Sequence, residues 1–244
     1  MKNLLILIYG ISAYLFAFST LVWFLLYIGG WDFLPYHIDS GAPQDLLSAV
    51  LINLGLVVLF SLQHSVMARQ SFKKWITQYI PASAERSTYV LVSGIFLALI
   101  FEYWQHIDGY LWQVENQTLQ IILIGLYIFG WVFSTIGSFL INHFELFGLE
   151  QVYLNLKNRP TPEVSFTENY FYKFVRHPIQ LGTLMGIWFT PSMSYTHLML
   201  SITFTIYIFI GLYFEEKDLV RELGKPYRQY QKRVSMMIPF LKFN

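Results

Sequence analysis

Cysteine is absent from this chain of 244 residues. Its absence excludes disulfides, thiolate metal ligands and a cysteine nucleophile. Charge is scarce as well, since Asp, Glu, Lys and Arg make up 13% of the residues and the net charge is +1. That balance gives no basic footprint for nucleic acid. The chain also lacks a Pro/Gly/Ser-rich linker, a charge block and an internal repeat, so residues 1–244 are expected to form a single domain.

Apolar residues are abundant instead: 55% of the chain is hydrophobic and 19% aromatic, with a mean hydropathy of +0.45. A soluble domain could not bury that much apolar surface. About 20 apolar residues cross the hydrocarbon core of a bilayer, and five runs qualify as spans: Leu4–Ile28, Leu46–Ala68, Ser87–Trp104, Leu119–Ile141 and Tyr195–Phe214. The first is expected to be a retained helix, because it exceeds a signal peptide's apolar segment and no small-x-small cleavage site follows.

A sixth segment, Ile179–Thr190, is shorter. Its 12 residues give about 18 Å of helix, so it either extends inward through residues 171–175 or dips into the membrane as one arm of a hairpin that turns at residues 191–194. The predicted fold is therefore all-α and polytopic, with five to six transmembrane segments, a C-terminal helical hairpin and an amphipathic tail.

Cations in the loops set the expected orientation. Residues 29–45, 105–118 and 191–194 contain no Lys or Arg, whereas Lys2, the loops 69–86 and 142–177 and the tail after residue 214 hold all 16. Because cytoplasmic loops carry the excess of Lys and Arg, both termini are expected on the cytoplasmic side of the membrane. The protein is predicted to be a multi-pass protein of a bacterial inner membrane.

Polar residues gather at the predicted inner ends of the spans. They are Gln63-His64-Ser65, Glu85-Arg86-Ser87, Asn142-His143-Phe144-Glu145, Arg176-His177-Pro178 and Glu215-Glu216. Any one of these histidines alone is more often an interfacial residue bonded to water or backbone. A metal site needs ligands at i, i+3 or i+4 of one helix, and no two histidines here are within nine residues of each other. No metal is therefore expected.

Arg176-His177-Pro178 precedes an apolar hairpin that ends in Glu215-Glu216. Proline suits the first turn of a helix, whose free N–H groups attract anions, and Arg176 could bind a carboxylate there. The glutamates suit an amine or a sulfonium cation. In the alternative interpretation, Arg176 reaches lipid headgroups and a glutamate pairs with Lys217 or Arg221.

The tail after the hairpin contains an amphipathic helical stretch, a break at Gly224 and a restart at Pro226, with Tyr227 and Tyr230 on one face. Such a cap could close over a ligand at the membrane interface. On base rates, however, tyrosines in this position are more often membrane-surface anchors.

These residues resemble the signature of the isoprenylcysteine carboxyl methyltransferase-like superfamily. The matching residues are Arg176-His177-Pro178, Gly182, Glu215-Glu216, Gly224, Tyr227, Tyr230, Val234 and Ile238-Pro239. The resemblance implies that residues 170–240 bind S-adenosylmethionine. The implied binding residues are Arg176, His177, Gln180, Leu181, Gly182, Glu215, Glu216, Tyr227 and Tyr230.

Two positions depart from the pattern: Gln180 replaces a usual tyrosine, and Met236 stands where arginine often precedes Ile-Pro. Outside the signature, residues 63–69, 85–89 and 142–149 resemble the branch that contains methanethiol S-methyltransferases and proteins linked to nitrogen-oxide metabolism. This resemblance implies methyl transfer to a small volatile thiol, with membrane lipid as the other partner. The alternatives are a lipid-like acceptor such as an isoprenylcysteine, or a non-catalytic protein such as a transporter or assembly factor.

The thiolate is the reactive form of a thiol, so a base is expected. A histidine can accept a proton near neutrality. His143 is favoured because Glu145 and Asn142 are close enough in sequence to orient it, with His64 as the alternative base. The competing interpretation is that the sulfonium charge alone acidifies the thiol and water takes the proton.

Overall fold

The computed structural model describes residues 1–31, 33–160 and 168–239. Five of the described helices are long and apolar enough to cross a membrane: α1 (Lys2–Ile28), α2 (Leu46–Met67), α4 (Ala82–Tyr103), α5 (Gln117–Ile141) and α9 (Tyr195–Leu223). The expected mostly helical, multi-pass architecture is thereby confirmed. Side chains cap two of these helices, where Asp45 and Asn116 each accept a hydrogen bond from a backbone N–H three residues on.

The helices form two compact units, and the chain passes between them several times. Unit 1 comprises residues 1–109, 143–162 and 194–197, and unit 2 comprises residues 110–142, 163–193 and 198–244. The expectation of a single domain stays a prediction.

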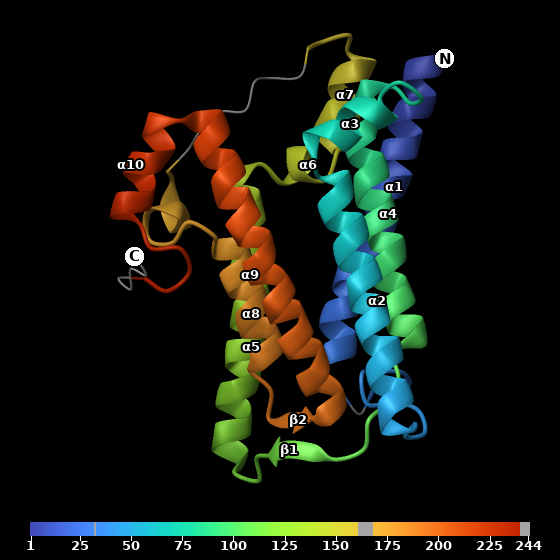
Figure 1. Cartoon of the computed structure of the whole chain (residues 1–244), viewed down its shortest axis with the longest axis vertical. Helices are drawn as coiled ribbons and strands as arrows, with labels where there is room; N and C mark the ends of the chain where they lie inside the picture. The colour runs from blue at the N-terminus through green and yellow to red at the C-terminus, as the bar shows by residue number, and fades with distance from the viewer. Residues whose placement is uncertain (32, 161–167, 240–244) are drawn as a thin grey trace. The chain divides into compact units, whose positions relative to one another are not determined.

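Unit 1 is built on α1, α2 and α4, which lie side by side in Figure 1. Close contact between α1 and α4 depends on Gly94, where a Cβ would lie 3.0 Å from the Ala17 Cα. Three short helices complete the unit: α3 (Gln70–Ile76), α6 (His143–Leu146) and α7 (Leu149–Leu156). The helix α7 packs on α1, where a Cβ on Gly10 would approach the Val152 side chain to 2.6 Å.

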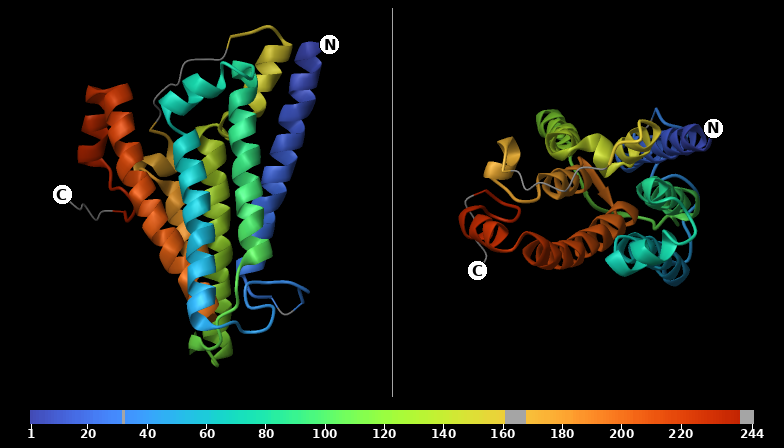
Figure 2. Two further views of the ribbon diagram at one scale, coloured as in Figure 1. Left: turned by 45° about the vertical axis from the view of Figure 1, so that its right-hand side comes forward. Right: turned by 90° about the horizontal axis from the view of Figure 1, so that it is seen from above.

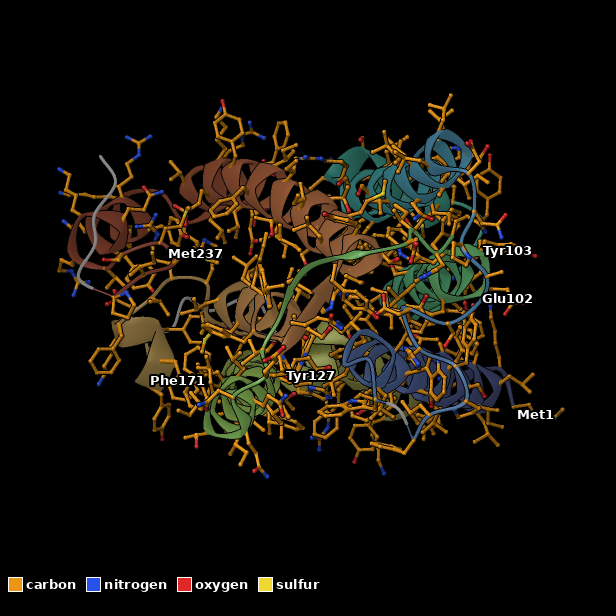
Figure 3. All side chains as sticks on the ribbon, turned by 90° about the horizontal axis from the view of Figure 1, so that it is seen from below. Met1, Glu102, Tyr103, Tyr127, Phe171 and Met237 are labelled. Atoms are coloured by element: carbon orange, nitrogen blue, oxygen red, sulfur yellow. The ribbon has the colours of Figure 1, made fainter. Side chains whose placement is uncertain are left out.

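Unit 2 contains α5, α8 (Pro178–Trp188), α9 beyond its first turn, and α10 (Lys225–Arg233), together with a 3-10 helix, η1 (Tyr170–Lys173). The right-hand view of Figure 2 shows unit 2 from above, with α5 nearly end on and α9 oblique to the view. Figure 3 is the view from the opposite end and labels Tyr127 on α5 and Phe171 on η1. The α8–α9 contact includes the Trp188 indole N–H, which donates to the Thr205 hydroxyl at 2.9 Å.

Two details of the hairpin differ from the expectation. The predicted turn contains a strand, β2 (Ser192–Ser194), which pairs with β1 (Tyr110–Gln113). The helical stretch expected after Phe214 is present, but it continues the preceding span without a break, so α9 runs to Leu223; its charged residues are mostly strong helix formers. At 11 residues, α8 rises about 16 Å, too little to cross a bilayer alone.

Candidate active site

Glu216 lies at the centre of a buried polar cluster in unit 2. Its Oε1 accepts hydrogen bonds from Arg176 Nε at 2.9 Å, His177 Nε2 at 2.6 Å and the Tyr227 hydroxyl at 2.8 Å. Its Oε2 accepts from Gln231 Nε2 at 2.5 Å. A carboxylate can only accept hydrogen bonds, so the His177 tautomer must carry its proton on Nε2. These contacts bring together four of the residues predicted to bind the cofactor.

Arg176 is fixed by more than this ion pair. Its Nη1 donates to the backbone carbonyls of Gln231 at 3.2 Å and Val234 at 2.7 Å. The side chains of Glu216 and Arg176 are each 12% exposed. Arg176 therefore fastens the end of α9 and the chain after α10 to the start of α8. Neither member of this pair was predicted to bind the other.

The alternative interpretation, in which a glutamate of the 215–216 pair forms an ion pair with Lys217 or Arg221, is wrong. Among the ion pairs of the described residues, neither Glu215 nor Glu216 pairs with Lys217 or Arg221, and Arg221 pairs with Asp218 at 3.3 Å. Lys217 donates to the Tyr213 hydroxyl at 2.5 Å. These two cations follow the ordinary i, i+3 and i, i+4 spacing of one exposed helix face.

The segment after α10 returns to the start of α8. Val175 and Ser235 form a parallel β-bridge, and the backbone N–H groups of Arg176 and His177 donate to the Ser235 and Met236 carbonyls at 2.9 and 3.2 Å. Figure 1 shows α10 folded back beside the last turns of α9. This backbone pairing brings the two ends of the signature together across some 58 residues of sequence.

The two tyrosines of α10 are buried in this arrangement, at 3% exposure for Tyr227 and 2% for Tyr230. Tyr230 donates to the Tyr172 backbone carbonyl at 2.5 Å. Burial, and then the negative charge of Glu216, raise the pKa of the Tyr227 hydroxyl far above its usual value. Tyr227 consequently remains a neutral donor to Glu216 at any physiological pH, rather than a membrane-surface anchor.

A cleft of about 680 Å³ opens beside Glu216. Its residues are Phe209, Tyr213, Glu216, Lys217, Val220, Arg221, Arg228, Gln231 and Met236. Small-molecule sites typically measure about 300–1,000 Å³ and combine apolar walls with a few polar groups. The cleft is therefore large enough for a nucleoside-sized ligand.

The other predicted cofactor residues have different surroundings. Gly182 is buried against α5, where a Cβ would collide with the Gly130 carbonyl oxygen and lie 2.6 Å from the Ser134 N. That contact is sufficient reason for glycine at this position. Gln180 and Leu181 lie half-buried on the first turn of α8, and Glu215 is exposed on α9. The cofactor contacts of these residues stay predictions.

In unit 1, the Glu85-Arg86-Ser87 motif holds the chain around α6. Arg86 Nε donates to the Leu146 carbonyl at 2.7 Å, and the Ser87 hydroxyl donates to the Gly148 carbonyl at 3.2 Å. Gly148 has a positive φ of 83° and lies against Ser87, where a Cβ would come within 2.7 Å of the Ser87 N. Residues 85–87 and 146–148, which are distant in sequence, are thus held together by hydrogen bonds and close packing.

His143, at the start of α6, is 3% exposed. Its Nε2 is 3.0 Å from the Tyr14 hydroxyl of α1, and the ring packs against Phe147 with centroids 4.7 Å apart. Burial lowers the pKa of His143 below its usual value. The Tyr14 hydroxyl helps to orient the ring, and the predicted orienting roles of Glu145 and Asn142 stay predictions.

His64, on α2, bridges two hydroxyl groups of α4. Its Nδ1 is 3.1 Å from Ser93 Oγ and its Nε2 is 2.7 Å from the Tyr89 hydroxyl. Tyr89 belongs to the same buried cluster on which Phe147, the neighbour of His143, packs. One aromatic cluster in unit 1 therefore connects the two predicted bases.

Sequence reasoning missed Gln231 and Tyr14, the residues that bond Glu216 and His143. They lie 15 and 129 positions from these partners, beyond the reach of local sequence patterns, so only the folded structure reveals the two contacts. No cluster of three or more His, Cys, Asp or Glu side chains suited to a metal occurs within residues 1–31, 33–160 and 168–239.

Comparison with protein families identifies a match over residues 51–237 to the family described as NnrU protein. The chain belongs to the NnrU family. A methanethiol S-methyltransferase of Crocosphaera subtropica is 43% identical over 97% of this chain and 92% of its own.

Another relative, the methanethiol S-methyltransferase of Mycobacterium tuberculosis, is 40% identical over 98% of both chains. Nurim of Bos taurus is 26% identical over 88% of this chain and 90% of its own. No solved structure matches. These relatives confirm the resemblance to the methanethiol S-methyltransferase branch.

Proposed function

We propose that this protein transfers a methyl group to methanethiol and releases dimethyl sulfide. The observation that carries the proposal is the similarity to proteins named methanethiol S-methyltransferase, at 40–43% identity over 97–98% of this chain. The cleft beside Glu216 supports it, because a methyl donor with a nucleoside portion needs a site of that size.

The proposed donor is S-adenosylmethionine, which supplies an activated methyl group on a sulfonium sulfur. The donor set fits this molecule: the buried carboxylate of Glu216 provides negative charge for a cationic ligand, and the cleft has apolar walls. Arg176, His177, Tyr227 and Gln231 hold Glu216 in place. In this proposal they keep the carboxylate ionised and aimed before the ligand arrives.

The acceptor imposes its own limits. Methanethiol has two heavy atoms, so it gains at most about 3 kcal/mol on binding, which corresponds to a millimolar dissociation constant. The rate must therefore come from positioning and from removal of the thiol proton. A lipid-facing protein suits this chemistry, because both the thiol and dimethyl sulfide partition into apolar surroundings.

We propose His143 as the proton acceptor, with Tyr14 as its positioning residue and His64 as the alternative base. Its lowered pKa keeps the imidazole neutral, the form that accepts a proton. The S–H proton would move to the ring as the thiol sulfur bonds to the methyl carbon and the methyl–sulfonium bond breaks. Glu145 is proposed to stabilise the resulting imidazolium.

The proposed location is a bacterial inner membrane, with both termini and the Glu216 cluster on the cytoplasmic side. This location is supported by the distribution of Lys and Arg, which all lie in loops and termini expected on the same side of the membrane. The Glu216 cluster would then be accessible to S-adenosylmethionine from the cytoplasm.

Headspace gas chromatography of the purified protein in nanodiscs tests the proposed function. With S-adenosylmethionine and methanethiol, dimethyl sulfide should accumulate, and omission of either compound should abolish it. Methylation of an isoprenylcysteine analogue, with no dimethyl sulfide, would favour a lipid-like acceptor instead. Absence of methyl transfer to every acceptor, from protein with native helix content, would favour a non-catalytic role.

A further inference from the structure

Three cations line the cleft beside Glu216: Lys217, Arg221 and Arg228. Two of them already have partners, since Lys217 bonds the Tyr213 hydroxyl and Arg221 pairs with Asp218. The guanidinium of Arg228 has no ion-pair or hydrogen-bond partner in the part of the chain that the structure describes, and the residue is exposed. An uncommitted guanidinium therefore borders a ligand-sized cleft.

Arg176, in contrast, has little left to offer a ligand. A guanidinium binds a carboxylate bidentately through two neighbouring nitrogens. In Arg176, Nε is bonded to Glu216 and Nη1 to two carbonyls. A bidentate bond would use Nη2 together with either Nε or Nη1, and both of these nitrogens already have partners. Bidentate binding of a ligand by Arg176 would therefore break the hydrogen bonds that hold Glu216.

Arg228 and Gln231 are three residues apart on α10 and therefore lie on one helix face. Gln231 lines the same cleft and is fastened to Glu216 Oε2. This bond sets the rotation of α10 and directs the face that carries Arg228 toward the cleft. The guanidinium is held near the site by the helix, yet it remains free to bond.

We infer that Arg228 binds the carboxylate of the amino-acid portion of the methyl donor. The inference rests on the proposed function, because it requires that the cleft accept S-adenosylmethionine. Arg176 then has a different task from the one predicted from sequence: it positions Glu216 and closes the chain ends around the cleft. Arg228 is the residue that distinguishes a ligand with an amino-acid portion from one without it.

Two ligands test this assignment by calorimetry on the full-length protein in nanodiscs. S-adenosylhomocysteine carries the amino-acid portion, whereas 5′-deoxy-5′-methylthioadenosine shares its adenosine and thioether but lacks that portion. Arg228→Ala should weaken S-adenosylhomocysteine binding by about 5- to 20-fold, the range of a charge-assisted bond at a partly exposed site. It should leave methylthioadenosine binding unchanged.

Matched variants distinguish the bidentate hydrogen bonding of the Arg228 guanidinium from the effect of its positive charge. Arg228→Lys should recover only part of the loss, because an ammonium cannot form the bidentate bond. Lys225→Ala removes one positive charge from the same helix outside the cleft and should change neither affinity. The circular dichroism of all three variants should match that of the unmodified protein.

Equal weakening of both ligands by Arg228→Ala, or no weakening of either, would overturn the assignment while leaving the proposed function intact. If the unmodified protein bound neither ligand, the proposed donor would fail first and the assignment with it.

Discussion

Coupling between Arg176 and Glu216 is the strongest energetic consequence of the structure. Arg176→Ala removes one bond to the carboxylate and two to backbone carbonyls, and Glu216→Ala leaves four donors without their acceptor. Breaking a buried ion pair from one side costs about 3–5 kcal/mol. With both side chains only 12% exposed, solvent screens this pair weakly. Each single replacement is therefore expected to lower the free energy of unfolding by that amount.

The double mutant should cost less than the sum of the two single mutants. The difference should be about 1.5–3 kcal/mol, the contribution of one charge-assisted hydrogen bond. Reversible unfolding in mixed micelles, followed by circular dichroism, measures all four proteins.

The Arg221–Asp218 pair provides the control cycle, because its side chains are 80% and 41% exposed. Its coupling should stay below about 1 kcal/mol. Additivity at Arg176 and Glu216 within about 0.5 kcal/mol would refute the claim that the pair organises the site.

Three further predictions follow from other parts of the molecule. Single cysteines at Ser40 and Gln117 should react with an impermeant thiol reagent in intact cells and one at Ser83 should not; labelling of Ser83 alone would reverse the proposed orientation. Gly182→Val should lower the thermal midpoint through collision with Gly130, at a cost of about 1–3 kcal/mol, whereas the same change at Gly125, which has open space around it, should cost less. His143→Gln should lower turnover about 100-fold without changing cofactor affinity, and unchanged turnover would exclude His143 as the base. Burial lowers the pKa of His143 in the folded protein, so as the pH falls the unfolded chain takes up the proton first. The contribution of His143 to stability should therefore be lost between a pH of about 6.5 and the lower folded-state pKa. If His143 is the base, turnover should also begin to fall only below a pH of about 6.5.

Hydropathy was sufficient to predict the long helices. The spans begin and end within a few residues of α1, α2, α4 and α5, because a run of apolar residues leaves few other structures in a membrane. Pro178 begins α8 and Gly224, with a φ of 64°, separates α9 from α10, as their backbone preferences predict.

The strands and the side-chain partners could not be predicted in the same way. The pairing of β1 with β2 depends on contacts between residues some 80 positions apart, and neither strand is longer than four residues. Similarly, charge alone suggested that Arg176 and Glu216 each bind a ligand, whereas the fold makes them partners across 40 positions. Local sequence predicts a helix end well and a long-range contact poorly.

The most direct test of the proposed function is transfer of an isotopic label. The purified protein is supplied with S-adenosylmethionine whose transferable methyl group is trideuterated, together with unlabelled methanethiol, and the headspace is analysed by mass spectrometry. The proposal predicts dimethyl sulfide that carries one trideuteromethyl group, formed at a rate proportional to the protein concentration and lost in Glu216→Ala. Unlabelled dimethyl sulfide, or none above the level without protein, would contradict it.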